Sequence, residues 1–215
     1  MEFAFSRPDN RPELSEQANA AIAFAALNGR LSTELRTRVY TPDGRRENVA
    51  GHSHMVAVVA SELAAQYFPE LDADRIARLG NIHDAVEAYV KDTPTDRITA
   101  DEETAKKERE QAGLLQIRHE YAEYPSFITL IDEYEVQESP ESRFVRMIDK
   151  LAPLLAHIND KGIGMRTHTD MTPTEIRTNN AHRAQQFLEE YPEQVTIIDI
   201  RSELAQLVAG VLEQG

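Results

Sequence analysis

The 215-residue sequence contains no cysteine. This absence excludes disulfide bonds, thiolate metal ligands and cysteine nucleophiles, and it fits a reducing compartment. The sequence also has no apolar run long enough to span a bilayer. Its first residues lack the basic and apolar segments of a secretory signal. We therefore expect a cytoplasmic protein that does not bind membranes.

Positive charge is scarce as well. The 23 Lys and Arg residues stand against 37 Asp and Glu residues, which gives a formal net charge of −14. Binding to a nucleic-acid polymer requires a basic surface, so we expect no such partner. A small phosphorylated ligand is compatible with this charge, because a metal ion and a few arginines can reverse the potential locally.

Most of the sequence has helical periodicity, and strand-like alternation is nearly absent. Hydrophobic residues make up 41% of the chain, which suffices for a core at this length. Internal repeats, low-complexity tracts and flexible linkers are absent from the sequence. We therefore predict an all-α protein, with one compact domain over residues 1–160 that includes an N-terminal helix. A C-terminal helical extension over residues 161–215 is expected to pack on the same domain.

Helix-start residues and prolines indicate where several helices lie. One helix is expected over about residues 48–67, and the next over about residues 72–90. A later helix is expected over residues 140–159, with a proline in its first turn. Residues 30–47 are polar and arginine-rich and contain a turn. Residues 194–200 are ambiguous between strand and helix, because several of them are β-branched.

His83 and Asp84 are adjacent within the second of these helices. A buried carboxylate is costly unless something compensates it, and a divalent metal would do so. Adjacent helical residues point about 100° apart, so both can reach one ion. His52 and Asp149, from neighbouring helices, would complete a set of two imidazoles and two carboxylates. Such a set suits one divalent ion of Mn, Fe, Co, Ni, Zn or Mg.

Glu87 follows His83 by four residues, on the same face of the expected helix. We interpret it as a general base or as a carboxylate behind the metal ligands, although many helical glutamates only form surface pairs. Arg36 and Arg38 belong to a basic island in an otherwise acidic chain, and we favour phosphate contact over simple solvation for one or two members of that island. Lys150 reaches phosphate or pairs with a neighbouring carboxylate.

Three runs carry a resemblance to a known family. They are residues 46–53 (Arg-Glu-Asn-Val-Ala-Gly-His-Ser), residues 83–95 (His-Asp-Ala-Val-Glu-Ala-Tyr-Val-Lys-Asp-Thr-Pro-Thr) and residues 146–151 (Arg-Met-Ile-Asp-Lys-Leu). The order His, His-Asp, Asp resembles that of the HD-domain metal-dependent phosphohydrolases, an all-α superfamily. The runs are similar in particular to the small-nucleotidase branch that includes bacterial 5'-deoxynucleotidases. The resemblance covers about residues 30–160.

The resemblance implies roles for residues at the matching positions. Glu87 would position or deprotonate the attacking water, and Asp92 would contact the ribose side or assist proton transfer. Arg36 or Arg38 would bind phosphate or sugar. The implied metal ligands are His52, His83, Asp84 and Asp149.

Three positions depart from the pattern of the branch. Val39 and Tyr40 stand where the branch has an aromatic residue beside the early arginine, and Lys91 stands where a glycine is common. Lys91 adds a cation that favours a more highly charged phosphate, so we place it among the substrate-binding residues. We expect these three positions to decide which substrate binds.

The expected function is hydrolysis of a (deoxy)nucleoside 5'-monophosphate by a metal-activated water. The alternative within the same class is a deoxynucleoside triphosphate triphosphohydrolase that releases tripolyphosphate. A non-catalytic binding module with the HD fold is the alternative from another class, and the intact ligand set disfavours it. The resemblance and the C-terminal helix together favour a homodimer.

Overall fold

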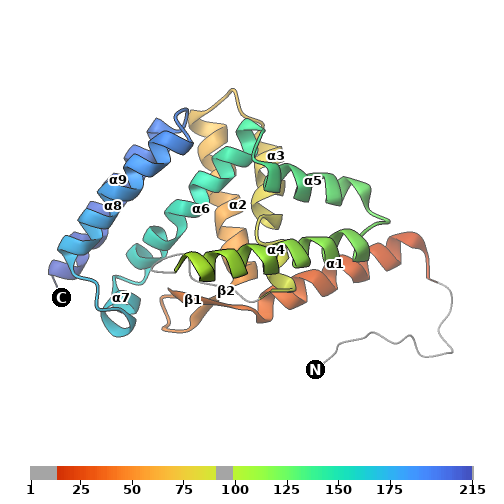
Figure 1. Ribbon diagram of the computed structural model, residues 1–215, viewed down its shortest axis with the longest axis horizontal. Helices are drawn as coiled ribbons and strands as arrows, with labels where there is room; N and C mark the ends of the chain where they lie inside the picture. The colour runs from red at the N-terminus through yellow and green to blue at the C-terminus, as the bar shows by residue number, and fades with distance from the viewer. Residues whose placement is uncertain (1–13, 91–98, 215) are drawn as a thin grey trace.

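The computed structural model describes residues 14–90 and 99–214. Helices make up most of this part of the chain (Figure 1), so the all-α prediction is confirmed. The helices are α1 (Glu16–Thr33), α2 (Val49–Tyr67), α3 (Ala73–Ile82), η1 (a 3₁₀ turn, Ala85–Ala88), α4 (Ala100–Glu120), α5 (Pro125–Val136), α6 (Pro140–Asn159), α7 (Ile163–His168), α8 (Pro173–Glu190) and α9 (Val195–Glu213). A two-stranded sheet of β1 (Leu35–Tyr40) and β2 (Arg46–Asn48) completes the fold.

Helices α2, α3 and α6 form the centre of the molecule. The side chain of Asn48 accepts a hydrogen bond from the first turn of α2, and Asp72 does the same for α3. The predicted starts of both helices are therefore confirmed. Gly80 allows α3 to approach α2 closely, because a Cβ atom at this position would lie 2.6 Å from the Cα atom of Ala57.

The helix that the sequence predicts over residues 72–90 is interrupted. Helix α3 ends at Ile82, and His83 and Asp84 form a turn before η1. The ring nitrogen Nδ1 of His83 lies 2.8 Å from the carbonyl oxygen of Gly80. In a continuing helix that oxygen would accept from the amide of Asp84, so the imidazole competes with the backbone at this point. The prediction that the His-Asp pair lies inside a helix is therefore wrong.

Helix α6 lies between the α2–α3 pair and the C-terminal helices α8 and α9 (Figure 1). One apolar cluster crosses all of these elements and contains Val56, Met147, Phe187 and Ile197. A second cluster joins α1, α4 and α5 around Ile117. The domain boundary expected at residue 160 stays a prediction, although side chains from both sides of it share the first cluster.

The sequence does not predict the β-hairpin, although it predicts the turn between its strands. The strands are antiparallel, and Gly44 in the connecting turn has a φ of +81°. The guanidinium of Arg46 donates to the carbonyl oxygens of Leu35 and Arg36, which ties the two strands together. A polar hairpin of this kind has little apolar alternation to reveal it. The hairpin places Arg36 next to the start of α2.

The ambiguous segment over residues 194–200 is helical and forms the first part of α9. Ile197 and Ile198 are buried in the main core, which explains the β-branched residues there. In the part of the chain that the structure describes, every helix is too short or too polar to cross a membrane.

Candidate metal centre

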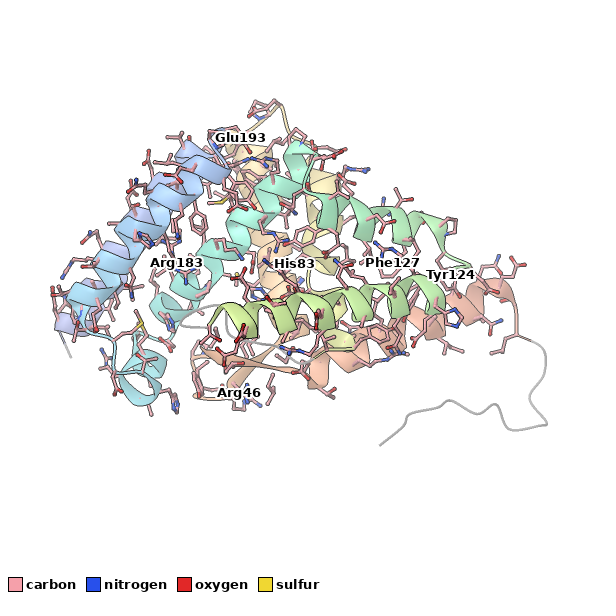
Figure 2. The ribbon with its side chains drawn as sticks, viewed as in Figure 1. Arg46, His83, Tyr124, Phe127, Arg183 and Glu193 are labelled. Carbon is pink, nitrogen blue, oxygen red and sulfur yellow. The ribbon has the colours of Figure 1, made fainter. Side chains whose placement is uncertain are left out.

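The four predicted metal ligands come from α2, the turn after α3 and α6. His83 of this group lies in the interior of the helical array (Figure 2). The Nε2 atom of His52 lies 3.1 Å from Oδ1 of Asp149 and 3.3 Å from Nε2 of His83. The Oδ2 atom of Asp84 lies 3.4 Å from Nε2 of His52 and 3.2 Å from Nε2 of His83. The ligand atoms of His52, His83 and Asp149 therefore all lie within 4.8 Å of one another, and the carboxylate of Asp84 adjoins both imidazoles.

The two imidazoles and the two carboxylates differ in their access to solvent. His52 is fully buried, and His83 is 3% exposed. The side chains of Asp84 and Asp149 are 19% and 13% exposed. The carboxylates therefore form the edge of the centre that a small ligand can reach, while the imidazoles form its back wall.

The hydrogen bond partner of His83 fixes the direction of its imidazole. Because Nδ1 faces the Gly80 carbonyl oxygen at 2.8 Å, Nε2 is the nitrogen that faces the centre. Behind His52 lies Glu47 of β2, whose Oε2 atom is 3.8 Å from Nδ1. This distance exceeds that of a hydrogen bond, so the contact is electrostatic. The sequence does not reveal this role of Glu47, because the residue belongs to the hairpin, which the sequence does not predict.

The charges of the centre balance one another. Burial alone would lower the pKa of His83, but the carboxylates of Asp84 and Asp149 raise it to about 10. Burial alone would raise the pKa of both carboxyl groups. The imidazoles beside Asp84 and the ammonium of Lys150 beside Asp149 hold each pKa well below its usual range. Metal ligands must be deprotonated, so a divalent cation that binds here would replace the imidazole proton. A donor set of nitrogen and oxygen atoms suits such a divalent cation.

Two of the predicted substrate-binding cations flank the centre. The guanidinium of Arg36 lies 3.5 Å from Asp84 Oδ2, and the ammonium of Lys150 lies 3.0 Å from Asp149 Oδ2. Pairing with a carboxylate is one of the two interpretations that the sequence leaves open for Lys150. Contact with phosphate stays a prediction for both residues.

Glu87 lies on η1, and its Oε2 atom is buried. Burial alone would lower the pKa of the Arg36 guanidinium. Nearby carboxylates raise it instead: Asp84 has the largest effect, and Glu87 also contributes. Glu87 therefore lies on the Arg36 side of the centre, although not on the continuous helix that the sequence predicts. Its role as a base stays a prediction. Lys91, Asp92 and the side chain of Arg38 lie outside the described residues.

Sequence analysis also gave no role to Tyr134 and Arg146, which extend the centre on the far side of His83. The ring of Tyr134 packs edge-on against that of His83, with the centroids 5.7 Å apart. The guanidinium of Arg146 lies 4.8 Å from the centroid of the same tyrosine ring. Within the described residues the Tyr134 hydroxyl is buried without a hydrogen bond partner. No local sequence pattern reveals this tyrosine, because it reaches the site from α5.

Comparison with known proteins places this arrangement among the HD domains. The sequence model of the HD-domain family matches residues 28–193. The chain is 31% identical to human 5'-deoxynucleotidase HDDC2 over 140 residues, which are 64% of this chain and 67% of the human protein. It is 32% identical over 130 residues to a 5'-deoxynucleotidase of Enterobacter sp. strain 638, which covers 56% of this chain and 64% of that protein.

A solved structure resembles the whole fold. It is a predicted metal-dependent phosphohydrolase from Magnetospirillum magnetotacticum, with a TM-score of 0.67 and 25% sequence identity. The match covers 92% of this chain and 99% of that structure. The similarity therefore extends from the hairpin and the central helices to the C-terminal helices, beyond the region that the three motif runs cover.

Proposed function

The chain belongs to the HD-domain family, and on that premise we propose that it is a metal-dependent phosphohydrolase of (deoxy)nucleoside 5'-monophosphates. The observation that carries this proposal is the convergence of two imidazole nitrogens and two carboxylate oxygens at the centre of the fold. The deoxynucleotidase activity named for the human and bacterial relatives supports the choice of a nucleotide as the substrate. The matched segment spans about two thirds of the length of those relatives.

The ion would be one divalent metal from the series Mn, Fe, Co, Ni, Zn and Mg, held by a mixed nitrogen and oxygen set. When bound, such an ion supplies positive charge that neutralises a phosphate ester and lowers the pKa of water. The residues that would hold it are His52, His83, Asp84 and Asp149.

The remaining residues have separate tasks in this proposal. Arg36 binds the phosphate from the hairpin side, and its side chain is 15% exposed, so that it reaches the edge of the centre. Lys150 binds the phosphate from the α6 side, where its side chain is 31% exposed. Glu87 accepts the proton of the attacking water. Asp92, outside the described residues, is predicted to assist proton transfer at the leaving oxygen.

Substitution of Glu87 by Gln tests the assignment of the base. With Mn²⁺ or Co²⁺ supplied, we expect kcat for release of phosphate from a panel of deoxynucleoside monophosphates to fall about 10²- to 10⁴-fold, while the bound metal stays unchanged. The matched control is Glu103→Gln on α4, because the Glu103 side chain is 55% exposed and pairs with Lys107. The hydrolase proposal fails if the wild-type protein releases no phosphate, pyrophosphate or tripolyphosphate from any nucleotide.

The same panel separates the alternatives. Release of inorganic phosphate from a monophosphate supports the nucleotidase, and release of tripolyphosphate from a triphosphate supports the triphosphohydrolase. If the protein binds a nucleotide but releases no product, the non-catalytic binding module is the supported alternative. A homodimer and a cytoplasmic location stay predictions.

A further inference from the structure

Three cations lie in a row on one face of α6. Arg143, Arg146 and Lys150 follow one another at intervals of three and four residues, so their side chains leave the helix on the same side. This face lines a cavity of about 380 Å³, which Gln137 after α5 and Phe187 of α8 also line. The volume lies in the range of pockets that hold small ligands.

The three cations differ in how their charge is compensated. Arg143 is paired, with its Nε atom 2.6 Å from a carboxylate oxygen of Glu193. Arg146 is half-buried and rests against the ring of Tyr134. Within residues 14–90 and 99–214 its guanidinium makes no hydrogen bond and no ion pair. Burial opposes the charge of Arg146, but Tyr134 and the carboxylates of Asp149 and Glu135 raise the pKa of its guanidinium above the usual value. These carboxylates make no direct pair with it, so an anion in the cavity would find its N–H groups unpaired.

The cavity adjoins the metal centre. Lys150 belongs to both, because it lines the cavity while its ammonium lies 3.0 Å from Asp149 Oδ2. The buried ring of Tyr134 fills the space between the imidazole of His83 and the guanidinium of Arg146, so Lys150 is the side chain that connects the cavity and the metal centre. A ligand with one anionic group at the metal centre can therefore place further groups along the cationic face of α6.

Gln137 adds an independent observation at the rim of the cavity. It has a φ of 57°, in the left-handed region that residues other than glycine rarely adopt. Its amide nitrogen donates to the carbonyl oxygen of Tyr134. Its Oε1 atom is buried and has no hydrogen bond partner within the described residues. The left-handed conformation is that of the C-cap of α5, and the amide oxygen only accepts, so it would meet a hydrogen bond donor of a ligand and not a phosphate oxygen.

We propose that this cavity is a second anion subsite, which binds the phosphate groups beyond the first when a nucleoside di- or triphosphate occupies the site. The inference rests on the proposed function, because it takes the first phosphate to lie at the metal centre. Lys150 lies between the two subsites, and Arg146 binds the outer phosphates. Arg146 therefore determines how strongly the protein prefers a polyphosphate to a monophosphate.

Equilibrium binding to the full chain tests this subsite. The probes are analogues of a deoxynucleoside monophosphate and triphosphate in which a methylene group replaces the ester oxygen, so that neither is hydrolysed. Calorimetry with Mn²⁺ in excess over nucleotide gives both Kd values. We expect Arg146→Met to weaken binding of the triphosphate relative to the monophosphate about tenfold or more. Arg118→Met is the matched control, because Arg118 forms an exposed pair with Asp132, and it should leave the ratio of the two Kd values unchanged.

A second variant keeps the proposal testable if Arg146→Met does not fold. Glu190 lines the same cavity and is exposed, so its replacement by Gln should not disturb the fold. Removal of its negative charge should strengthen triphosphate binding about two- to fivefold. An unchanged Kd ratio in both variants, or an equal loss for both nucleotides in Arg146→Met, would overturn the subsite. Neither measurement needs turnover, so a failure of the hydrolase proposal is recognised separately by the absence of product.

Discussion

The two sides of helix α6 hold charges of opposite sign. Toward α2 and α3, Asp149 faces two imidazoles, with its Oδ1 atom 3.1 Å from His52 Nε2 and 3.7 Å from His83 Nε2. Toward α8, the same helix presents a row of cations that includes Arg146. Arg146 and Asp149 are three residues apart, so these two sides adjoin, and one helix carries two opposite potentials over a short distance.

The two sides of α6 also differ in how completely the charges of their side chains are compensated by opposite charges. In the metal centre Asp84 and Asp149 raise the pKa of the His83 imidazole, so that its proton balances carboxylate charge there. On the cavity side the direct contact of Arg146 is an aromatic ring, and the carboxylates of Asp149 and Glu135 act on it without pairing directly. The first side would exchange one cation for another when a metal binds, whereas the second side keeps guanidinium N–H groups that bond to no described residue. This contrast would allow an acidic chain to bind the anionic ligand proposed above.

The largest expected effect comes from breaking the metal side. Asp149→Ala removes an oxygen ligand and leaves the two imidazoles without it. We expect metal affinity to fall more than about 100-fold, since substitutions behind a ligand already cost about 10- to 100-fold, and phosphate release should disappear. Metal analysis of the purified protein and the nucleotide panel measure both effects. Asp132→Ala, at an exposed pair with Arg118, is the control. Full metal content in Asp149→Ala would refute the ligand assignment, and Arg146→Met should keep its metal.

The sequence reveals the metal side of α6 far better than the cavity side. Histidine and aspartate are rare in buried positions, so three short runs that contain them in a fixed order predict a common site. Helix starts are also predictable, because Asn48 and Asp72 bond to the backbone amides of their own helices. Both kinds of signal are local in the sequence.

What the sequence does not reveal depends on contacts between distant segments. Glu47 lies behind His52 because the hairpin folds onto α2, and Tyr134 reaches His83 from α5. The end of α3 before His83 depends on a bond between an imidazole and a carbonyl oxygen, which a periodic pattern cannot show. Arg146 begins the third motif run, but the sequence does not show that Tyr134 of α5 packs against it or that residues of α8 line the same cavity.

A middle-sized effect is expected where α3 meets α2, on the metal side. Gly80→Ala would place a methyl group 2.6 Å from the Cα atom of Ala57, so the two helices must move apart. We expect the free energy of unfolding to fall by about 1–3 kcal/mol, as for other overpacked sites. Urea unfolding measures this change.

The control for that substitution lies in the C-terminal helices. Gly210 is within α9, and a Cβ atom there would meet nothing within 4 Å. Gly210→Ala should therefore stabilise the protein by up to about 1 kcal/mol, through helix propensity alone. A Gly80→Ala protein as stable as the wild type would contradict the close approach of the two helices.

The smallest effect concerns the buried His83 and the partly buried His157, whose pKa values shift in opposite directions. Carboxylates raise the pKa of His83 to about 10 against the effect of burial. At the end of α6, burial lowers the pKa of His157, and the weaker influence of Asp160 does not reverse it. The Nδ1 atom of His157 is buried and has no hydrogen bond partner among the described residues. Burial, which the carboxylate of Asp160 only partly offsets, is therefore the cause of the downward shift of this pKa.

The sign of the resulting pH dependence follows from proton binding. An unfolded histidine titrates near pH ~6.5, and the folded His157 titrates lower, so the unfolded chain binds more protons as the pH falls below neutrality. The free energy of unfolding should therefore decrease as the pH is lowered through this range, by at most about 1.4 kcal/mol per pH unit for one group. His157→Gln should reduce that decrease between pH ~7.5 and ~5.5 in urea unfolding, whereas His119→Gln, at an exposed position on α4, should not. An identical decrease in the wild type and in His157→Gln would show that His157 is not buried in its neutral form, and the contrast with His83 would then rest on the metal centre alone.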